Sequence, residues 1–482
     1  MPSTSPVISD NFSLVQGRAQ NRRRMPTTMT EAAAKAKAAR RALQQLNNQR
    51  VPLYFTVAIA GLVMMFIILR WTRITLDRHA SRPNISTTTR AANGLFRKFR
   101  YLLNRPARGF TSVGHLVLVL AYLAINIALT VTNIDWSSLI GIAKRCGWMA
   151  ITNTAFITFL ALKNTPLAYL ITCSHERLNQ LHQIGGYTTV TYVFLHLILM
   201  CETFNQEHFI EILLEVPQIH AIVAASAILV ILVTAITVRK LSYELFYLTH
   251  ITMFMLFVIN VGFHRPDFAL KTIIITIFTA CLWSSDRILR LCRILWYIYQ
   301  NKATITPLPN GGTRIVLRRS PSRASPGTHC FLWIPRIRLG ETHPFTIVSA
   351  TPHSLELVVT AYDGFTKDLH KHAMLHPGAS LRASIDGPYG AIPEFSNTTD
   401  KVILIAGGSG ASFTFGVALD MIKKLGNSSK TTIDFIWAVK TQESLSWFAK
   451  ELSELQGSPL VTTLLHRLAE STIPHFTDTS FL

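Results

Sequence analysis

The stretch that decides the fold is residues 179–201, NQLHQIGGYTTVTYVFLHLILMC, an apolar segment with a histidine near each end. A second segment, residues 244–264, ELFYLTHITMFMLFVINVGFH, repeats the arrangement. Each is close to the roughly 20 residues that a helix needs to cross a bilayer. The first pair is His182 and His196 and the second is His250 and His264, so both pairs are 14 residues apart.

This spacing places both histidines of a pair on one helix face. Fourteen steps of about 100° end roughly 40° short of four full turns, and they separate the two side chains by about 21 Å along the axis. Two such helices running in the same direction offer two stacked sites with an imidazole from each side, which suits two six-coordinate haems. The alternative, structural histidines at helix ends, fits isolated ones such as His115 or His220 better, because polar groups inside spans are costly and usually functional.

The composition indicates a membrane protein. The 482 residues are 49% hydrophobic and only 15% charged, with a mean hydropathy of +0.30. Seven spans are expected, at residues 51–69, 111–132, 147–162, 179–201, 219–238, 244–264 and 269–284. The net charge of +21 does not favour a nucleic-acid partner, because Lys and Arg lie mostly in the N-terminal tail and between the spans. The six cysteines form no CxxC pair, which argues against a zinc site or a disulfide framework.

Loop charges predict the orientation. The loop 202–218 has four Glu and no Lys or Arg, so it is expected outside, whereas the basic segment 71–109, Arg239-Lys240 and the arginines of 287–293 are expected inside. Everything after about residue 300 is then cytoplasmic. Seven spans put the basic tail, residues 1–50, outside, so either the first segment is not a span or this end breaks the rule.

The remaining chain predicts two cytoplasmic domains. Short strands are expected at 313–318, 330–334 and 355–361, and strands at 401–405 and 432–439 alternate with helices at 414–425 and 444–455. These patterns indicate a β domain over residues 302–396 and an α/β domain over residues 400–482. They follow the tail (1–50), an N-terminal span (51–70) and a helical domain (110–300).

Three motifs in this half carry possible chemistry. His343-Pro344-Phe345-Thr346 follows a β run, and Gly387-Pro388-Tyr389-Gly390 is interpreted as a turn whose glycines let a phosphate approach. Gly407-Gly408-Ser409-Gly410 lies between a strand and a helix, a place for an anion. The alternative for His343–Thr346 is an ordinary strand with its turn, and the alternative for Gly407–Gly410 is a tight connection between a strand and a helix. Gly185-Gly186 fits equally a macrocycle near the backbone and helix packing.

Over residues 110–455 the chain resembles the fungal ferric-chelate reductases, relatives of the NADPH oxidases. The resemblance rests on Gly147–Ala150, Leu178–His182, Tyr243–Phe246, the histidine pairs and the three motifs. It implies an all-α transmembrane haem-binding bundle of six core spans plus one N-terminal span, then a β-barrel flavin domain and an α/β nucleotide-binding domain.

The resemblance also assigns residues. His182 and His250 would hold an inner haem b, His196 and His264 an outer one, and His343, Pro344, Phe345 and Thr346 would line FAD. The Gly-rich segments Gly387, Pro388, Tyr389, Gly390 and Gly407, Gly408, Ser409, Gly410 would bind NADPH. Asp363-Gly364-Phe365-Thr366 is similar to a second flavin-side segment, although the family usually has Lys where Asp363 stands.

The implied function is electron transfer from cytosolic NADPH to ferric or cupric chelates or siderophores outside the plasma membrane. Its partners would be membrane lipid and a downstream iron permease or oxidase, with no nucleic acid. One alternative is a superoxide-generating NADPH oxidase. Another is a truncated, catalytically incomplete haem membrane protein, because no Cys follows Cys330 to form the Cys-Gly element that ends the family's nucleotide domain.

Overall fold

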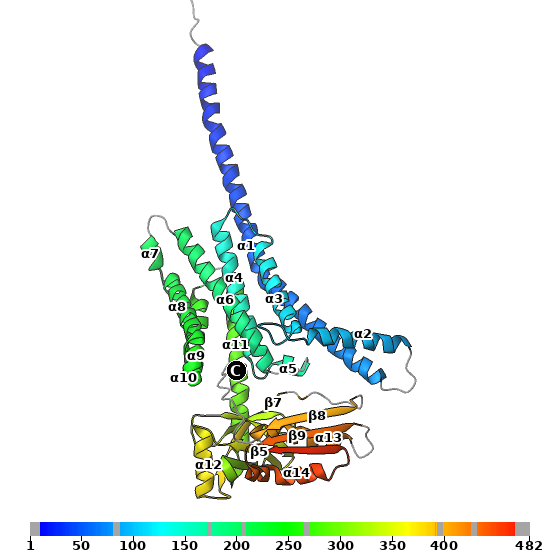
Figure 1. Ribbon diagram of the computed structural model, residues 1–482. Coiled ribbons are helices and arrows are strands. Elements are labelled where there is room, and N and C mark those ends of the chain that lie inside the picture. The colour runs from blue at the N-terminus through cyan, green and yellow to red at the C-terminus, as the bar shows by residue number, and fades with distance from the viewer. Residues whose placement is uncertain are drawn as a thin grey trace, which may run out of the picture. The chain divides into compact units, whose positions relative to one another are not determined.

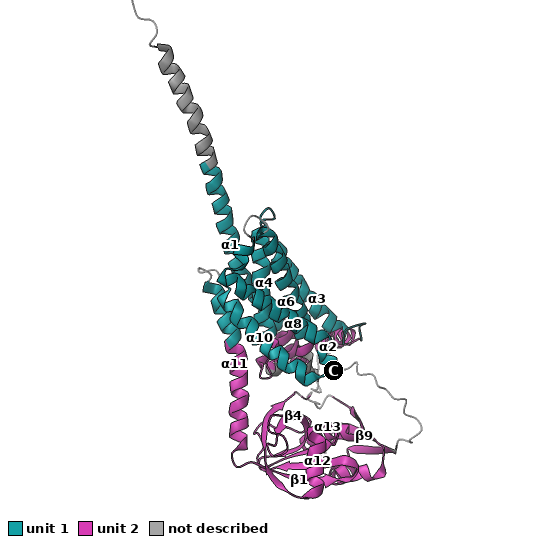
Figure 2. Ribbon diagram, turned by 90° about the vertical axis from the view of Figure 1, so that its left-hand side faces the viewer, with its two compact units in different colours: residues 1–63, 106–158, 181–280 teal, residues 64–105, 159–180, 281–482 magenta. Residues whose placement is uncertain are grey.

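The computed structural model describes residues 10–80, 87–170, 175–204, 209–264, 270–390, 392, 399–425 and 431–467. The chain forms two compact units (Figure 2). Unit 1 comprises residues 1–63, 106–158 and 181–280, and unit 2 comprises residues 64–105, 159–180 and 281–482.

Unit 1 is a bundle of helices (Figure 1). Its helices are most of α1 (Asp10–Ala80), α3 (Val113–Val131), most of α4 (Leu139–Ala161) and of α6 (His175–Phe204), α7 (Phe209–Leu213), α8 (Val216–Ile236), α9 (Val238–Leu241), α10 (Tyr243–Phe263) and the first part of α11 (Leu270–Ile298). Among the described residues, six helical segments are long and apolar enough to cross a membrane: Glu31–Leu76, Val113–Val131, Leu178–Phe204, Val216–Leu241, Tyr243–Phe263 and Leu270–Ile298. The predicted transmembrane bundle is confirmed.

Two predicted spans differ in detail from the helices. The expected span 147–162 lies in α4, which is not among the six apolar segments. This helix is instead the most enclosed of the bundle, with Ala143, Met149 and Asn153 fully buried. The expected span 51–69 is part of α1, a continuous helix of 71 residues that also includes most of the basic tail.

Buried polar side chains tie the helices of unit 1 together. Tyr122 on α3 donates to Asn153 Oδ1 at 2.5 Å, and the Asn153 amide donates to Asn126 Oδ1 at 2.8 Å. Arg145, only 2% exposed, donates to Asn48 Oδ1 at 2.7 Å and to three carbonyls at the end of α3. Positive charge there satisfies carbonyls that the end of a helix leaves unpaired.

Unit 2 contains an antiparallel seven-stranded sheet with the order β6-β1-β2-β5-β4-β3-β7. The strands are β1 (Lys302–Leu308), β2 (Gly312–Leu317), β3 (His329–Trp333), β4 (His343–Thr351), β5 (Ser354–Thr360), β6 (Ser380–Arg382) and β7 (Ser384–Tyr389). Helix α12 (Phe365–Leu375) packs on β1 and β2. Alternating apolar residues of the strands, such as Ile315, Leu332 and Leu357, form the core between the sheet and this helix.

A second, parallel sheet has the order β10-β9-β8, from β8 (Lys401–Gly407), β9 (Thr432–Val439) and β10 (Val461–Arg467). Helices α13 (Ala411–Leu425) and α14 (Ala449–Gln456) accompany it, and the core holds Phe415, Phe435, Trp437 and Phe448. The predicted β domain followed by an α/β domain is confirmed. Strand β10 extends the parallel sheet beyond the elements expected from the sequence.

Unit 2 also contains α2 (Thr87–Leu103) and α5 (Pro166–Leu170). The segment 71–109 was singled out for its basic charge and expected on the cytoplasmic side. Its residues 71–80 end helix α1, and its residues 87–103 form helix α2.

Candidate functional site

The four histidines of unit 1 form two facing pairs. The ring centres of His182 and His250 are 6.3 Å apart, and those of His196 and His264 are 6.2 Å apart. Each histidine faces its counterpart in sequence order, so helices α6 and α10 run in the same direction, the arrangement that two stacked sites require.

These distances fit a metal held between two imidazoles. A metal–nitrogen bond of about 2 Å and about 1.2 Å from nitrogen to ring centre put two opposed ring centres about 6.4 Å apart. The observed 6.3 and 6.2 Å agree for both pairs. The residues present thus fit two haem irons, each with one imidazole from either helix.

Three of the four rings are oriented by backbone carbonyls. His182 Nδ1 lies 2.8 Å from the Ile157 carbonyl, and His196 Nδ1 lies 2.7 Å from that of Ala143. His264 Nδ1 lies 2.9 Å from the Pro217 carbonyl. A ring that donates from Nδ1 presents the lone pair of Nε2 to a metal, and such bonds fix the tautomer and raise ligand basicity. Within the described residues, His250 Nδ1 is buried without a partner.

The carbonyls on α4 have the same spacing as the histidines they hold. Positions 143 and 157 are 14 residues apart, and they face 196 and 182 in the reverse order. Helix α4 therefore lies antiparallel to α6 in a fixed register. Next to this contact, a Cβ on Gly147 would lie 3.1 Å from the His196 ring, so the glycine makes room for the imidazole to reach its carbonyl.

If His196 and His264 hold a haem, we expect Gly147→Val to displace the His196 ring and weaken retention of that haem by about 10- to 100-fold, the usual effect of disturbing the groups around a metal ligand. Haem content per chain and the low-temperature absorption bands of the reduced protein measure this. Gly61→Val is the matched control, because a Cβ at Gly61 meets nothing within 4 Å. Full retention of both haems in the Gly147 variant would contradict the assignment of this glycine.

Gly185 and Gly186 were expected either to pack helices together or to let a macrocycle approach the backbone, and the two glycines differ in this respect. A Cβ on Gly185 would come within 2.5 Å of the Ile157 side chain, so this glycine serves helix packing. A Cβ on Gly186 would meet no atom within 4 Å. The open side of Gly186 is compatible with a flat ligand near the backbone.

The isolated His220 has a structural partner. Its Nδ1 lies 2.8 Å from Asn260 Oδ1, and its ring stacks on Phe263 with ring centres 5.0 Å apart. Asn260 lies one turn before His264 on α10. Sequence reasoning did not single out Asn260, a buried amide in an apolar span, although polar residues in spans are the usual signal for a specific role.

In unit 2 the structure brings together the two segments expected to contact a flavin. The His343 ring stacks on Phe365 with ring centres 4.7 Å apart, and Phe345 lies 6.2 Å from the same ring. Gly364, with φ +68°, precedes α12. The Thr366 hydroxyl accepts from the Tyr362 N–H at 2.9 Å. The motif His343–Thr346 is part of strand β4, and Asp363 follows the neighbouring strand β5.

The Gly387–Gly390 motif was interpreted as a turn open to a phosphate, and this is wrong for its first three residues, which belong to β7. A Cβ on Gly387 would lie 2.9 Å from Cys330 Cβ. Gly387 therefore allows β7 to approach β3 closely, and Gly390 has φ +92° just after the strand. The Tyr389 hydroxyl donates to Asp386 Oδ1 at 2.8 Å.

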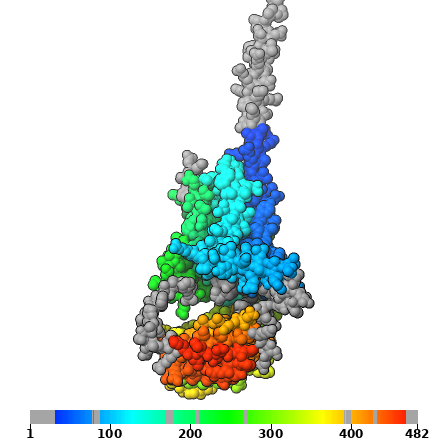
Figure 3. All heavy atoms as spheres, turned by 45° about the vertical axis from the view of Figure 1, so that its right-hand side comes forward, coloured from blue at the N-terminus to red at the C-terminus, as the bar shows by residue number. Residues whose placement is uncertain are grey.

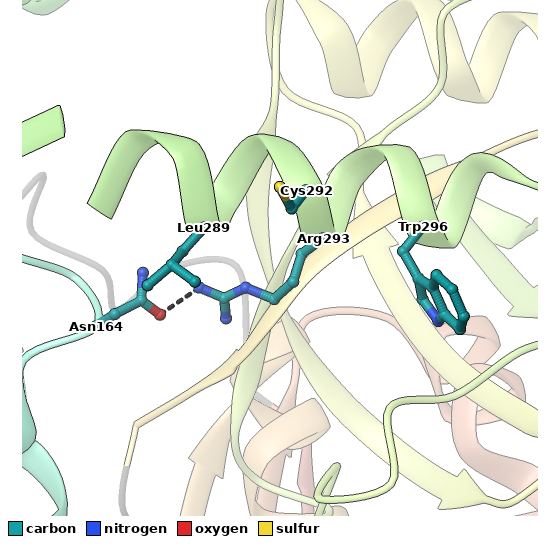
Figure 4. Close-up of a pocket in the computed structure, with 5 residues that line it drawn as sticks. All are labelled: Asn164, Leu289, Cys292, Arg293 and Trp296. Atoms are coloured by element: carbon teal, nitrogen blue, oxygen red, sulfur yellow. Dashed lines mark hydrogen bonds between the residues drawn. The ribbon is translucent and has the colours of Figure 1, made fainter. Parts of the chain in front are cut away.

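Asp386, which sequence reasoning missed, is the centre of a buried charge cluster. It is fully buried, Arg290 Nε donates to it at 2.7 Å, and Arg293 Nε lies 3.4 Å away. Arg293 also donates to the Asn164 side chain beside a hollow of about 410 Å³ along α11 (Figure 4). Paired charges of this kind are how a buried carboxylate is tolerated.

Lys163 lies beside this cluster, with Nζ 3.4 Å from the centre of the Phe331 ring. Burial, followed by the charge of Arg290, lowers the pKa of Lys163 to about 7. The unfolded chain, with a lysine pKa of 10.5, binds one proton more than the folded chain between these values. Stability therefore rises with pH across this window.

We expect Lys163→Met to raise the melting temperature at pH 6.5 and to flatten its rise between pH 7 and 9, since the buried charge is removed. Thermal unfolding across this pH range measures both effects. Lys440→Met, at an exposed position, is the control and should follow the parent curve. Parallel curves for parent and Lys163→Met would contradict the lowered pKa.

The Gly-rich segment at the end of β8 is open. Residues Gly408–Gly410 form a short 3-10 turn before α13, and Gly408 has φ +50°. A Cβ at Gly407, Gly408 or Gly410 would meet nothing within 4 Å. These glycines are therefore not required for packing, and the space next to the turn is free for a ligand. Trp437 Nε1 donates to the Gly408 carbonyl at 3.1 Å and supports the turn from β9. An open turn at a helix N-terminus fits a phosphate.

Sequence models of three protein families match the chain in order. These are the ferric reductase like transmembrane component at residues 146–261, an FAD-binding domain at 299–393 and the ferric reductase NAD binding domain at 399–460. The chain is therefore of the class that joins a ferric reductase-like membrane component to flavin- and nicotinamide nucleotide-binding domains. More closely, it is a homologue of the fungal ferric/cupric reductases.

Two relatives illustrate the match. A probable cell surface ferric reductase of Aspergillus oryzae is 26% identical over 367 residues, covering 70% of this chain and 48% of that protein. Ferric/cupric reductase transmembrane component 2 of Schizosaccharomyces pombe is 26% identical over 382 residues, covering 68% and 66%. The chain thus spans about half of the Aspergillus protein. A solved structure, the ferredoxin reductase in carbazole 1,9a-dioxygenase, has a TM-score of 0.29 and 14% identity, covering 36% of this chain and 53% of that one.

Proposed function

We propose that this protein carries electrons from cytosolic NADPH across the membrane to ferric or cupric chelates. The observation that supports this best is the pair of facing histidine pairs, 6.3 and 6.2 Å between ring centres, in a chain that also matches FAD- and NAD-binding domains. When bound, a flavin turns a two-electron hydride into single electrons, and haem irons relay them one at a time.

In this proposal His182 and His250 hold the inner haem b, and His196 and His264 hold the outer one. The 14-residue spacing sets the two histidine pairs that would hold the haems about 21 Å apart along the helices. The carbonyls on α4 and α8 keep three of these rings in the metal-binding orientation, so little rearrangement is needed to receive the cofactors.

In unit 2, we assign FAD to the face built by His343, Pro344, Phe345 and Thr346 together with Gly364–Thr366. The contact between His343 and Phe365 supports this, because it joins the two segments. NADPH is assigned to the open turn Gly407–Gly410 at the start of α13. Within the segment Gly387–Gly390, we assign Tyr389 and Gly390 to the NADPH site. Gly387 instead allows strand β7 to pack against β3.

We further propose that unit 2 from residue 302 onward is cytoplasmic and that the membrane is the plasma membrane. The acidic loop 202–218 and the basic residues of 287–293 support this orientation. The Aspergillus relative is a probable cell surface ferric reductase, which agrees with this location. The reduced metal would pass to an iron permease or oxidase.

The test uses the full chain in lipid nanodiscs with added FAD. We expect b-type haem absorbance, reduction of both haems by NADPH faster than by NADH, and reoxidation by a ferric chelate. Lack of haem absorbance would refute the haem assignment. Haems reduced by dithionite but not by NADPH would indicate a haem protein without nucleotide-driven input. Reoxidation only by oxygen, with a superoxide-sensitive dye responding, would indicate an oxidase.

A further inference from the structure

Helix α2, TTTRAANGLFRKFRYLL, divides into an apolar and a basic face. At about 100° per residue, its larger apolar side chains fall within one half of the helix circumference, and its charged ones fall within the other half. The apolar side chains are Leu95, Phe96, Phe99, Leu102 and Leu103, and the basic ones are Arg90, Arg97, Lys98 and Arg100. The helix has no acidic residue, so the basic face has one sign of charge.

Most of the apolar face of α2 is exposed, although Phe96 and Leu103 are half-buried. None of its 17 residues, all of which the structure describes, is buried. Leu95 is 71% exposed, Phe99 49% and Leu102 51%. The segment, in the light blue of residues near 100, stands at the surface in the space-filling view (Figure 3). Exposed apolar side chains gathered on one helix face mark an interaction surface.

The chain holds α2 close to a bilayer. It begins 11 residues after Leu76, where the first candidate span ends, and the next span starts at Val113, 10 residues after Leu103. At no more than about 3.5 Å per residue, neither connection exceeds roughly 40 Å. Four charges in 17 residues make α2 itself unsuitable as a span. A helix with this composition and position fits the bilayer surface.

We propose that α2 lies in the bilayer surface, with Leu95, Phe99 and Leu102 among the acyl chains and its basic face on anionic phospholipid headgroups. The positive charge of the helix favours anionic phospholipid as the partner of this surface. A neutral protein or lipid surface would bury the apolar face but offer no counter-charge to Arg90, Arg97 and Lys98, whereas anionic lipid suits both faces. Each basic residue near such a surface strengthens binding by about fivefold. This inference is independent of the haem and nucleotide assignments.

The first test maps the two faces in the full chain. A photoreactive benzoylphenylalanine is placed in turn at Leu95, Phe99 and Leu102, and for comparison at Arg90 and Arg97. The protein is reconstituted into nanodiscs of phosphatidylcholine with one fifth phosphatidylserine and irradiated. We expect adducts to phospholipid acyl chains, located by fragmentation in mass spectrometry, at the three apolar positions and not at the two basic ones. Cross-links to protein at the apolar positions would overturn the proposal.

The second test addresses the headgroup. Adducts at Phe99 should contain phosphatidylserine well above its share of the lipid. The variant Arg90→Gln/Arg97→Gln/Lys98→Gln, which removes three of the four positive charges, should lower this enrichment several-fold while keeping the adducts, and Arg97→Lys should retain it. Lys440→Gln/Lys450→Gln, at exposed positions in another domain, should change nothing. Equal enrichment in the parent and the triple variant would show that anionic headgroups are not recognised.

Discussion

The His250→Leu variant is expected to contain one haem b per chain instead of two, with the outer haem unaffected. Leucine cannot ligate a metal, and His182 alone cannot supply both axial positions of a six-coordinate iron. The same loss is expected for His182→Leu, while His196→Leu and His264→Leu should remove the outer haem. Haem content by the pyridine haemochromogen assay, with low-spin signals in electron paramagnetic resonance, measures the loss.

Two other histidines serve as controls for this experiment. His115→Leu and His220→Leu should keep two haems, because the His220 ring contacts Asn260 and Phe263 and the His115 ring contacts Phe110. If His250→Leu or His182→Leu retained both haems, the pairing would be wrong. Loss of both haems in every variant would instead indicate that the bundle folds only with its cofactors.

Asp386→Asn is expected to destabilise the antiparallel sheet domain by about 3–5 kcal/mol, the usual effect of removing one partner from a buried ion pair. The amide cannot balance Arg290 and Arg293, which contact the fully buried carboxylate. It also weakens the acceptor of the Tyr389 hydroxyl. Thermal unfolding and the midpoint of FAD release on heating measure the change.

The matched control is Asp434→Asn on β9. Asp434 pairs with Lys401 at 2.8 Å, but its side chain is 29% exposed and the lysine is 54% exposed. Exposed pairs contribute only about 0–1 kcal/mol, so this variant should unfold close to the parent. Equal effects of the two substitutions would show that burial does not strengthen the Asp386 cluster.

The sequence predicted the parts of the fold that depend on local periodicity. Apolar runs of the right length marked the spans, and the 14-residue spacing predicted that both histidines of each pair would lie on one helix face. The pairing of His182 with His250 was implied by the family resemblance, and their rings do face each other. Strand β9 was expected at the residues where it occurs. These features follow from side chains within one element, which periodicity can register.

Helix α2 was within reach of the same reasoning but was missed. Its apolar residues recur at Leu95, Phe99 and Leu102, the i, i+4, i+7 pattern of a helix face. Interpreting residues 71–109 by their charge alone hid that pattern. The net charge of a segment predicts on which side of a membrane it lies, whereas the spacing of its apolar residues predicts whether it forms a helix or a strand.

Other features depend on long-range contacts that no local pattern contains. Asp386 meets arginines more than 90 positions earlier in the chain, and the carbonyls that orient His182 and His196 belong to α4. A backbone carbonyl carries no sequence signal of its own. The glycine at 147 was noted as part of a family motif, but its role beside His196 required the packed helices.

The shared 14-residue register limits how the lengths of these helices can vary among relatives. One inserted residue between His182 and His196 would turn His196 by about 100° and shift it by about 1.5 Å, away from both its carbonyl and its partner on α10. The same holds between residues 143 and 157 of α4 and between His250 and His264. In an alignment of related chains, gaps should therefore fall in the connections and not inside these three intervals.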